Sequence, residues 1–159
     1  FICCRTFLPH MIKRNAGVII NMDGGGGTTG AFPGASAYGC AKVAIVRFTE
    51  TLAAELETIG SAVVAVCLNP GFVATELSKR GVDTPYKAQW VPHVLDKLVN
   101  NKGVPPDRCA QTAVKLLKVI APELSGRAFK NATDYEKVSK NLKRIKDENL
   151  FVIKYVTMD

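Results

Sequence analysis

Two short apolar runs flank a long amphipathic segment in the first half of the chain, and this order constrains the fold more than any other feature. The runs Val18–Met22 and Ala62–Leu68 are apolar and rich in β-branched residues, which is typical of buried strands in a parallel sheet. From Ser36 to Ile59, apolar residues recur every three or four positions, and Gly60 then ends the predicted helix. A strand, a helix and a strand in this order predict a parallel pair joined by a right-handed crossover.

Helix and strand patterns continue on both sides of this unit. Residues 1–14 are predicted to be the second half of a helix, and further helices are predicted at 89–99 and 105–120. Residues 124–129 are predicted to form a third strand. Thr133 and Glu136 have the spacing of a capping box for a last helix ending near Glu148, and 150–156 is expected to be a terminal strand or a packed tail.

Three predicted strands are fewer than the roughly five to seven of a doubly wound sheet. We therefore predict an α/β fold, a Rossmann-like doubly wound parallel sheet of which this chain forms only the C-terminal half.

The composition is that of a folded globular protein, with 47% hydrophobic and 22% charged residues. The longest wholly apolar run is far shorter than the roughly twenty residues of a membrane helix, so no membrane span is predicted. The five cysteines form no CxxC pair and the two histidines lack neighbours at ligand spacing, which predicts reduced thiols, a cytoplasmic location and no metal site. The net charge of +7 is interleaved with acidic residues, which argues against a nucleic-acid partner.

A glycine-rich segment follows the first predicted strand. Gly25, Gly27 and Gly30 satisfy G-x-G-x-x-G, the spacing that lets a backbone approach a pyrophosphate. In dinucleotide-binding folds such glycines lead directly into a helix, whereas residues 31–34 intervene here. The acidic residue at the expected distance, Glu50, lies inside a predicted helix. We therefore do not assign the segment to phosphate binding.

Tyr38 and Lys42 are the residue pair in the sequence best suited to acid–base chemistry. A spacing of four residues places both on one face of the predicted helix. A phenol is a poor acid–base group at neutral pH, but a nearby ammonium favours phenolate and lowers the pKa. Such a pair is able to exchange a proton with a carbonyl oxygen.

Three motifs surround this pair in a fixed order: Pro33-Gly-Ala-Ser-Ala-Tyr-Gly-Cys-Ala-Lys42, Leu52-Ala-Ala-Glu-Leu56 and Leu68-Asn-Pro-Gly-Phe-Val-Ala-Thr75. With the strand before them, they closely resemble the short-chain dehydrogenase/reductase family, and the resemblance extends from Phe1 to about Phe129. It implies a Rossmann fold and a nicotinamide cofactor, either NAD or NADP. It also implies hydride transfer between that cofactor and a small-molecule carbonyl or alcohol.

The resemblance also assigns roles to individual residues. Tyr38 corresponds to the family's proton donor or acceptor, and Lys42 to the residue that lowers the tyrosine pKa and holds the nicotinamide ribose hydroxyls. The loop residues Pro70, Gly71, Val73 and Thr75 correspond to those that contact the cofactor near its carboxamide.

One partial Rossmann-type domain, divided into four segments, is expected from this resemblance. Residues 1–75 hold the catalytic pair and the cofactor loop, and 76–106 correspond to the variable substrate lid. Residues 107–129 supply a helix and the last strand, and 130–159 a C-terminal helix and tail.

The sequence departs from the family's pattern in two respects. The position expected for the catalytic serine falls on Gly25, or on Gly24 or Gly26 because the segment is one residue longer than usual, and none of these has a hydroxyl. Asp23 supplies a carboxylate instead, and Thr28 or Thr29 are the candidate substitutes. Loss of such a hydroxyl costs on the order of a hundredfold in rate. The family's pyrophosphate turn and the residue that selects NAD or NADP would precede Phe1. We therefore expect a fragment that binds dinucleotide poorly by itself.

These departures leave a second function open beside the enzyme. The chain is either part of an NAD(P)-dependent short-chain dehydrogenase/reductase, or an inactive truncated relative that serves as a binding or scaffold protein or is a gene remnant. The apolar helix faces also permit a homo-oligomer.

Overall fold

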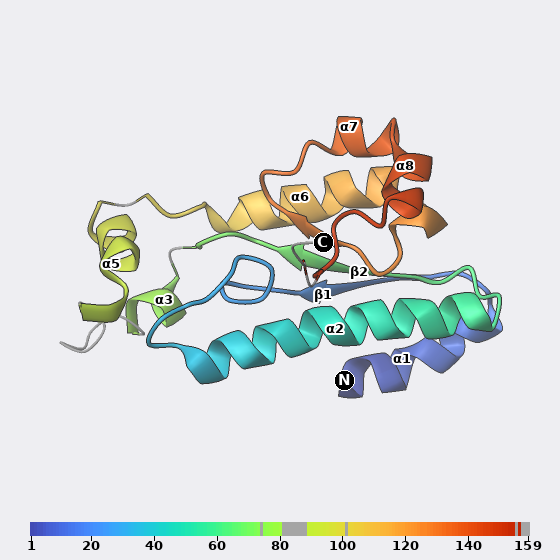
Figure 1. Ribbon diagram of the computed structural model, residues 1–159, viewed down its shortest axis with the longest axis horizontal. Helices are drawn as coiled ribbons and strands as arrows, with labels where there is room; N and C mark the ends of the chain where they lie inside the picture. The colour runs from blue at the N-terminus through green and yellow to red at the C-terminus, as the bar shows by residue number, and fades with distance from the viewer. Residues whose placement is uncertain (74, 81–88, 101, 155, 157–159) are drawn as a thin grey trace.

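A parallel sheet of three strands forms the centre of the computed structural model, which describes residues 1–73, 75–80, 89–100, 102–154 and 156. The strands are β1 (Val18–Met22), β2 (Val64–Asn69) and β3 (Ala128–Lys130), in that spatial order. Val18 of β1 pairs with Val64 of β2, and Cys67 of β2 pairs with Ala128 of β3. The predicted parallel strand–helix–strand unit is therefore confirmed (Figure 1).

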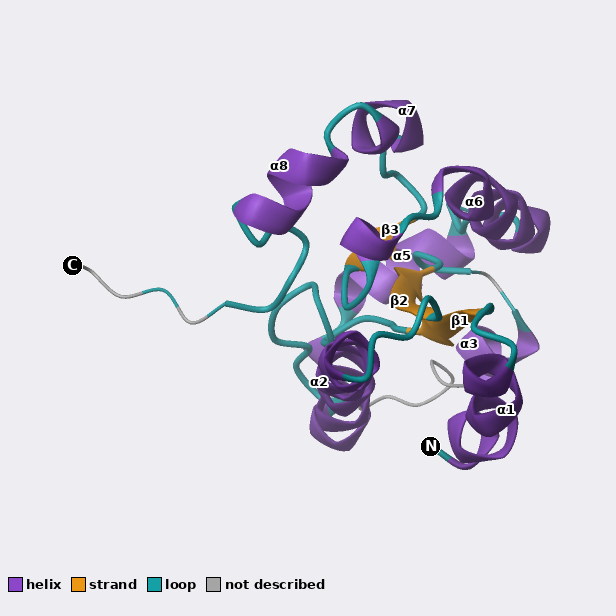
Figure 2. Ribbon diagram, turned by 90° about the vertical axis from the view of Figure 1, so that its right-hand side faces the viewer, coloured by secondary structure: helices purple, strands orange, loops and turns teal. Residues whose placement is uncertain are grey.

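Helices cover both faces of this sheet (Figure 2). On one face lie α1 (Ile2–Lys13) and α2 (Ser36–Thr58), and on the other α6 (Pro106–Val119), α7 (Tyr135–Ser139) and α8 (Leu142–Asp147). Two short helices, α3 (Glu76–Arg80) and α5 (Pro92–Val99), lie beyond the carboxyl ends of the strands. This arrangement confirms the predicted Rossmann-like α/β class.

The central strand β2 supplies residues to both hydrophobic clusters because its side chains alternate between the two faces. Val64, Val66 and Leu68 pack in the cluster that contains Leu116 of α6. Ala65 points the opposite way, into the cluster with Leu56 of α2. All six residues of β2 are buried, which explains the unbroken apolar run in the sequence.

The predicted strand at 124–129 is wrong in its first half. A 3-10 turn, η1 (Pro122–Leu124), occupies that part, and the strand begins only at Ala128. Gly126 separates the two with a φ of +77° while its amide donates to the carbonyl of Ala65 at 2.7 Å. The positive φ interrupts extended backbone there, because residues other than glycine rarely adopt it.

The last predicted helix is divided into α7 and α8, and its predicted capping residue is displaced by one position. Asp134 is the N-cap, since its Oδ1 accepts the amide of Lys137 at 3.0 Å. The Thr133 hydroxyl instead accepts the amide of Lys130. Of the two expectations for 150–156, the packed tail fits residues 150–153, where the ring of Phe151 lies 5.2 Å from that of Phe129, centre to centre. Val156 is 82% exposed, and residue 155 lies outside the described residues.

The helix predicted at 89–99 is present in part as α5, while residues 81–88 and 101 of the predicted lid lie outside the described residues. Among the residues that the structure does describe, none of the helices is sufficiently long and apolar to cross a membrane.

Replacement of Leu116 by Ala tests the packing of α6 on the sheet. Leu116 is wholly buried, whereas its neighbour Leu117 is 45% exposed. We expect Leu116→Ala to lower the free energy of unfolding by about 2–5 kcal/mol, because it removes buried contacts and leaves a cavity. Urea unfolding measures the difference. Leu117→Ala is the matched control, and an equal loss for both variants would contradict the described orientation of α6.

Cysteine reactivity provides a second test of the core. Cys67 is 1% exposed, its thiol donates to the Thr49 hydroxyl at 3.1 Å, and burial raises its pKa to about 11. Cys40 is exposed on α2. Because the thiolate is the reacting form, we expect iodoacetamide at pH 8 to label Cys40 and spare Cys67 until the protein is denatured. Peptide mass mapping shows which sites are labelled, and equal native labelling would place Cys67 at the surface.

Candidate active site

Tyr38 and Lys42 lie one turn apart near the start of α2, beside the carboxyl end of β1. The ammonium of Lys42 donates to the carbonyl of Met22 at 3.1 Å. Its Nζ lies 5.6 Å from the centre of the Tyr38 ring, within the range of a cation–π contact. The structure thus brings the two side chains together, as their spacing predicts.

The electrostatics of Tyr38 differ from the expectation that Lys42 lowers its pKa. Tyr38 is 47% exposed, and partial burial of the phenol raises its pKa. The negative charge of Asp23 raises the pKa of Tyr38 further. Lys42 lies over the ring and is hydrogen-bonded to the Met22 carbonyl. Tyr38 therefore keeps its proton at neutral pH in this arrangement.

The glycine loop after β1 approaches the Tyr38 hydroxyl at Gly24. A Cβ atom added to Gly24 would lie 2.4 Å from the phenol oxygen, whereas one added to Gly25 would meet the ring of Phe32 at 3.8 Å. The residue opposite the Tyr38 hydroxyl is therefore Gly24, one position before Gly25. The difference of one position agrees with a loop that is one residue longer than the usual spacing.

The two threonines expected as substitutes for the serine are bonded within the loop. The Thr28 hydroxyl donates to Oδ2 of Asp23 at 2.7 Å, and the Thr29 hydroxyl accepts the amide of Gly26 at 3.0 Å. These contacts stabilise the loop itself. The glycines form turns, and α2 begins only at Ser36. The glycine run therefore does not lead directly into a helix, as a phosphate-binding fingerprint does.

Asp23 is a residue of the site to which the sequence analysis assigned no role. It follows β1 directly and is 3% exposed. Its Oδ2 accepts the amide and hydroxyl of Thr28 and the side-chain amide of Asn69 at 3.4 Å. A carboxylate immediately after an apolar strand is the sequence signal that could have identified it, because buried acids are rare without partners.

The loop after β2 carries the other predicted cofactor residues. Asn69 Oδ1 accepts the amide of Gly71 at 2.9 Å, and Gly71 has a φ of +77°. Val73 forms a parallel bridge with Val104. Thr75 lies at the start of α3, where its hydroxyl contacts that of Ser78 at 3.3 Å.

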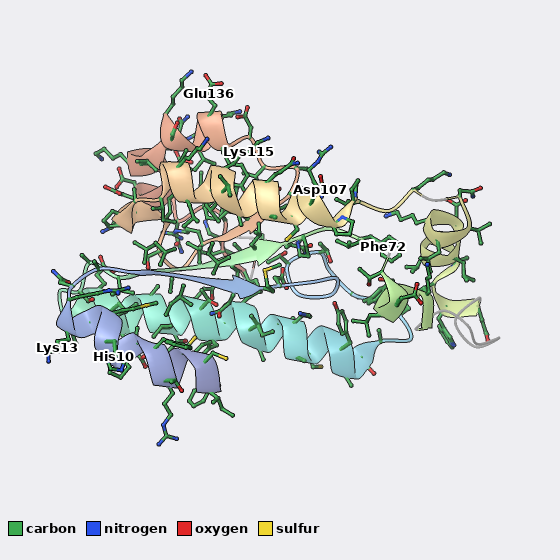
Figure 3. All side chains as sticks on the ribbon, turned by 180° about the vertical axis from the view of Figure 1, so that it is seen from behind. His10, Lys13, Phe72, Asp107, Lys115 and Glu136 are labelled. Carbon is green, nitrogen blue, oxygen red and sulfur yellow. The ribbon has the colours of Figure 1, made fainter. Side chains whose placement is uncertain are left out.

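Parallel pairing of β1 and β2 brings this loop to the same edge of the sheet as Tyr38 and Lys42. Phe72 lies on the same side of the molecule as Asp107 in the first turn of α6, whereas Lys13 of α1 lies at the opposite end (Figure 3). The predicted catalytic and cofactor residues therefore share one end of the fold.

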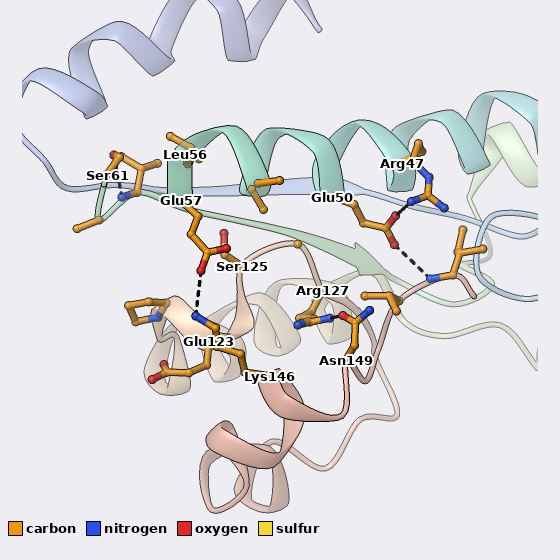
Figure 4. A pocket seen from close by; sticks show the side chains of 18 residues that line it. Arg47, Glu50, Leu56, Glu57, Ser61, Glu123, Ser125, Arg127, Lys146 and Asn149 are labelled. Atoms are coloured by element: carbon orange, nitrogen blue, oxygen red, sulfur yellow. Dashed lines mark hydrogen bonds and ion pairs between the residues drawn. The ribbon is translucent and has the colours of Figure 1, made fainter. Parts of the chain in front are cut away.

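A cavity of about 360 Å³ lies elsewhere, between α2, η1 and the tail (Figure 4). It borders Ser61, which precedes β2, and is crossed by the ion pair between Lys146 and Glu57 at 3.0 Å. Its acidic and basic residues balance, and the amide of Ile153 donates to Glu50 there. The cavity is thus separate from the Tyr38 site and belongs to the docking of the tail. Among the described residues, there is no group of acids, cysteines and histidines that could hold a metal ion.

Comparison with protein families decides the classification. The model of the short chain dehydrogenase family matches residues 1–85, more than half of the chain. The chain belongs to the short chain dehydrogenase family. The matched residues include Tyr38, Lys42 and the loop from Pro70 to Thr75.

Two curated relatives illustrate the similarity. The 2-(R)-hydroxypropyl-CoM dehydrogenase of Xanthobacter autotrophicus is 38% identical over 85 residues, which cover 54% of this chain and 33% of the relative. The 3-oxoacyl-[acyl-carrier-protein] reductase of Chlamydia muridarum is 30% identical over 133 residues, which cover 79% of this chain and 48% of that protein. The chain therefore spans at most about half the length of either relative.

Solved structures show the same fold. A short chain dehydrogenase/reductase from Burkholderia phymatum, solved in complex with NAD, matches with a TM-score of 0.61 at 17% identity, over 98% of this chain and 57% of its own. An oxidoreductase of the family from Burkholderia thailandensis matches with a TM-score of 0.63 at 19% identity, over 94% and 57%. At these identities the likeness establishes the fold.

Alanine at positions 24 and 25 tests the close approach of the loop to Tyr38. We expect Gly24→Ala to displace the Tyr38 ring, since its Cβ would overlap the phenol oxygen, and Gly25→Ala to leave it in place, since its Cβ finds ordinary contact distance. The tyrosine ring resonances in NMR spectra report the displacement. Equal shifts of the Tyr38 signals in both variants would contradict the predicted placement.

Proposed function

We propose that the chain carries the catalytic pair of an NAD(P)-dependent oxidoreductase that transfers hydride between nicotinamide and a small-molecule carbonyl or alcohol. The observation that carries this proposal is the placement of Tyr38, Lys42 and the loop after β2 at one edge of a parallel sheet in a member of the short chain dehydrogenase family. Ligands of open α/β sheets bind at the carboxyl ends of strands.

The residues present fit a nicotinamide nucleoside. An ammonium has three donors, and Lys42 uses one on the Met22 carbonyl, which leaves donors for the two hydroxyls of a ribose. The loop of Pro70, Gly71, Val73 and Thr75 provides backbone groups for a carboxamide. When bound, the cofactor supplies or accepts the hydride.

Tyr38 is the proposed proton donor. Its pKa lies above the ordinary value, so the phenol is protonated at neutral pH and donates to the carbonyl oxygen of a substrate that receives hydride. Residues 76–106 are proposed to form the substrate lid, as part of the division into segments at 75, 106 and 129.

A second function is favoured by one observation, the glycine opposite the Tyr38 hydroxyl. Gly24 offers no hydroxyl to polarise a substrate carbonyl, and a preorganised donor of that kind contributes about a hundredfold or more to the rate. An inactive relative that binds a ligand or partner would tolerate this change. Cofactor binding without hydride transfer to a panel of ketones, aldehydes and 3-oxoacyl esters would favour the second function.

Tyr38→Phe provides the direct test of the enzyme function. In the complete protein, with NADH or NADPH and a carbonyl substrate, we expect turnover to fall by roughly 10²–10⁴-fold, because the proton donor is lost, while cofactor affinity changes little. The absorbance of the reduced nicotinamide at 340 nm and calorimetry measure the two quantities.

Tyr135→Phe is the matched control for this experiment. The Tyr135 hydroxyl donates to the carbonyl of Lys130 at 3.1 Å, before α7, so the same chemical change there should leave turnover close to wild type. Full activity of Tyr38→Phe would remove Tyr38 from the mechanism.

A further inference from the structure

Asp23 has a buried carboxylate with hydrogen-bond partners for only one of its two oxygens in the described part of the chain. The residue is 3% exposed. Oδ2 accepts three hydrogen bonds, whereas Oδ1 has no hydrogen-bond partner among the described residues. An acid kept in this state costs stability, because a buried charged oxygen without a donor has lost its hydration. Such groups are concentrated at functional sites.

The three accepted bonds join two separate loops. Thr28 belongs to the glycine loop after β1 and bonds Oδ2 through both its amide and its hydroxyl, at 3.3 and 2.7 Å. Asn69 is the last residue of β2, directly before the next loop, and donates its side-chain amide to the same oxygen at 3.4 Å. Because Asn69 Oδ1 also holds the amide of Gly71, the Asp23 contact helps to fix the orientation of the whole Asn69 side chain.

The glycine loop is shaped around this carboxylate. A Cβ atom added to Gly27 would lie 1.9 Å from Oδ1 of Asp23, so the backbone of the loop passes directly against the carboxylate. Three residues earlier, Gly24 lies against the Tyr38 hydroxyl. The loop therefore contacts Asp23 on one side and Tyr38 on the other.

We propose that Asp23 is a positioning residue that couples the glycine loop to the loop after β2 and thereby sets the position and the charge environment of the Tyr38 phenol. The proposal rests on the function proposed above for Tyr38 and the loop of Pro70 to Thr75. It assigns the carboxylate no contact with substrate or cofactor, because Asp23 acts through Thr28, Asn69 and its charge.

In the described part of the chain, two charged groups face the Tyr38 phenol. Lys42, from the same helix, lies over the ring, and Asp23 approaches from the end of β1. Phe32, from the glycine-rich segment, contacts the ring edge and is uncharged. The charge of Asp23 raises the pKa of Tyr38 in addition to the larger effect of burial, so neutralising Asp23 must lower that pKa.

The test compares Asp23→Asn with the wild-type protein by NMR. Carbon-13 labelling of the tyrosine Cζ atoms follows the ionisation of each phenol, and Tyr38→Phe identifies the Tyr38 signal. We expect Asp23→Asn to shift the Tyr38 titration to lower pH and to accelerate amide hydrogen exchange at both Thr28 and Gly71. Glu57→Gln, which neutralises an exposed carboxylate remote from the site, should change neither measurement.

A second variant keeps the charge and breaks one contact. Thr28→Val removes the hydroxyl bond to Asp23 and is nearly equal in size, so it tests the coupling even if Asp23→Asn does not fold. We expect faster exchange at Gly71, on the other loop, with an unchanged Tyr38 titration. The proposal would be overturned if amide exchange in Thr28→Val became faster only in the glycine loop. It would also be overturned if Asp23→Asn left the Tyr38 titration unchanged.

These measurements separate the proposal from the function on which it rests. Neither the titration nor the exchange measurement requires cofactor or turnover. If the loops prove to be coupled but the protein transfers no hydride, the proposed function is refuted and the role of Asp23 in shaping the site is retained. In an active protein, Asp23→Asn should also move the alkaline limit of the carbonyl-reduction rate to lower pH. An unmoved limit with normal folding would contradict the role of Asp23.

Discussion

The parallel pairing of β1 with β2 is the interaction on which the rest of the structure depends. Five successive residue pairs, from Val18 with Val64 to Met22 with Leu68, align the ends of the two strands. The residues that follow, Asp23 on one strand and Asn69 on the other, therefore meet at one edge, where their side chains bond. A shift of one residue in this register would reverse the faces of β2 and separate those side chains. Core packing and the geometry of the site are thus set by the same ladder of hydrogen bonds.

The site shows how a charge from a neighbouring strand modifies the chemistry of a familiar residue pair. Tyr38 and Lys42 provide the same two functional groups wherever this spacing occurs on a helix, but the protonation of the phenol depends on what surrounds it. Here burial and the carboxylate of Asp23 stabilise the neutral phenol, while the ammonium of Lys42 is held by the carbonyl of Met22. The short chain dehydrogenase fold positions the pair, and residues at the end of β1 change the pKa of the phenol and hold the ammonium.

The sequence predicted the elements whose patterns are long or buried, and missed details that depend on single contacts. The period of α2 and the apolar runs of β1 and β2 were sufficient to give the parallel unit, and the motif around Tyr38 identified the family. The sequence left the residue opposite the Tyr38 hydroxyl open among three glycines, because a glycine-rich loop has no periodicity to fix its path. The cap at Asp134 was missed because its neighbour Thr133 offers a nearly equal local signal. The turn at Gly126 interrupts a predicted strand at a single residue, which the apolar pattern does not reveal. The bridge from Asp23 to Asn69 joins residues 46 positions apart, which local patterns do not reveal.

The packed tail has a consequence for synthesis and folding. The outward-facing amide of Ala128 on β3 donates to the carbonyl of Phe151 at 2.9 Å, and the amide of Ile153 reaches back 103 positions to Glu50. An open strand edge attracts other chains, and this one is covered by a segment made more than twenty residues later. During translation the edge of β3 is thus exposed until residues 151–153 leave the ribosome, an interval in which a chaperone or a neighbouring nascent chain competes with the tail for the same amide.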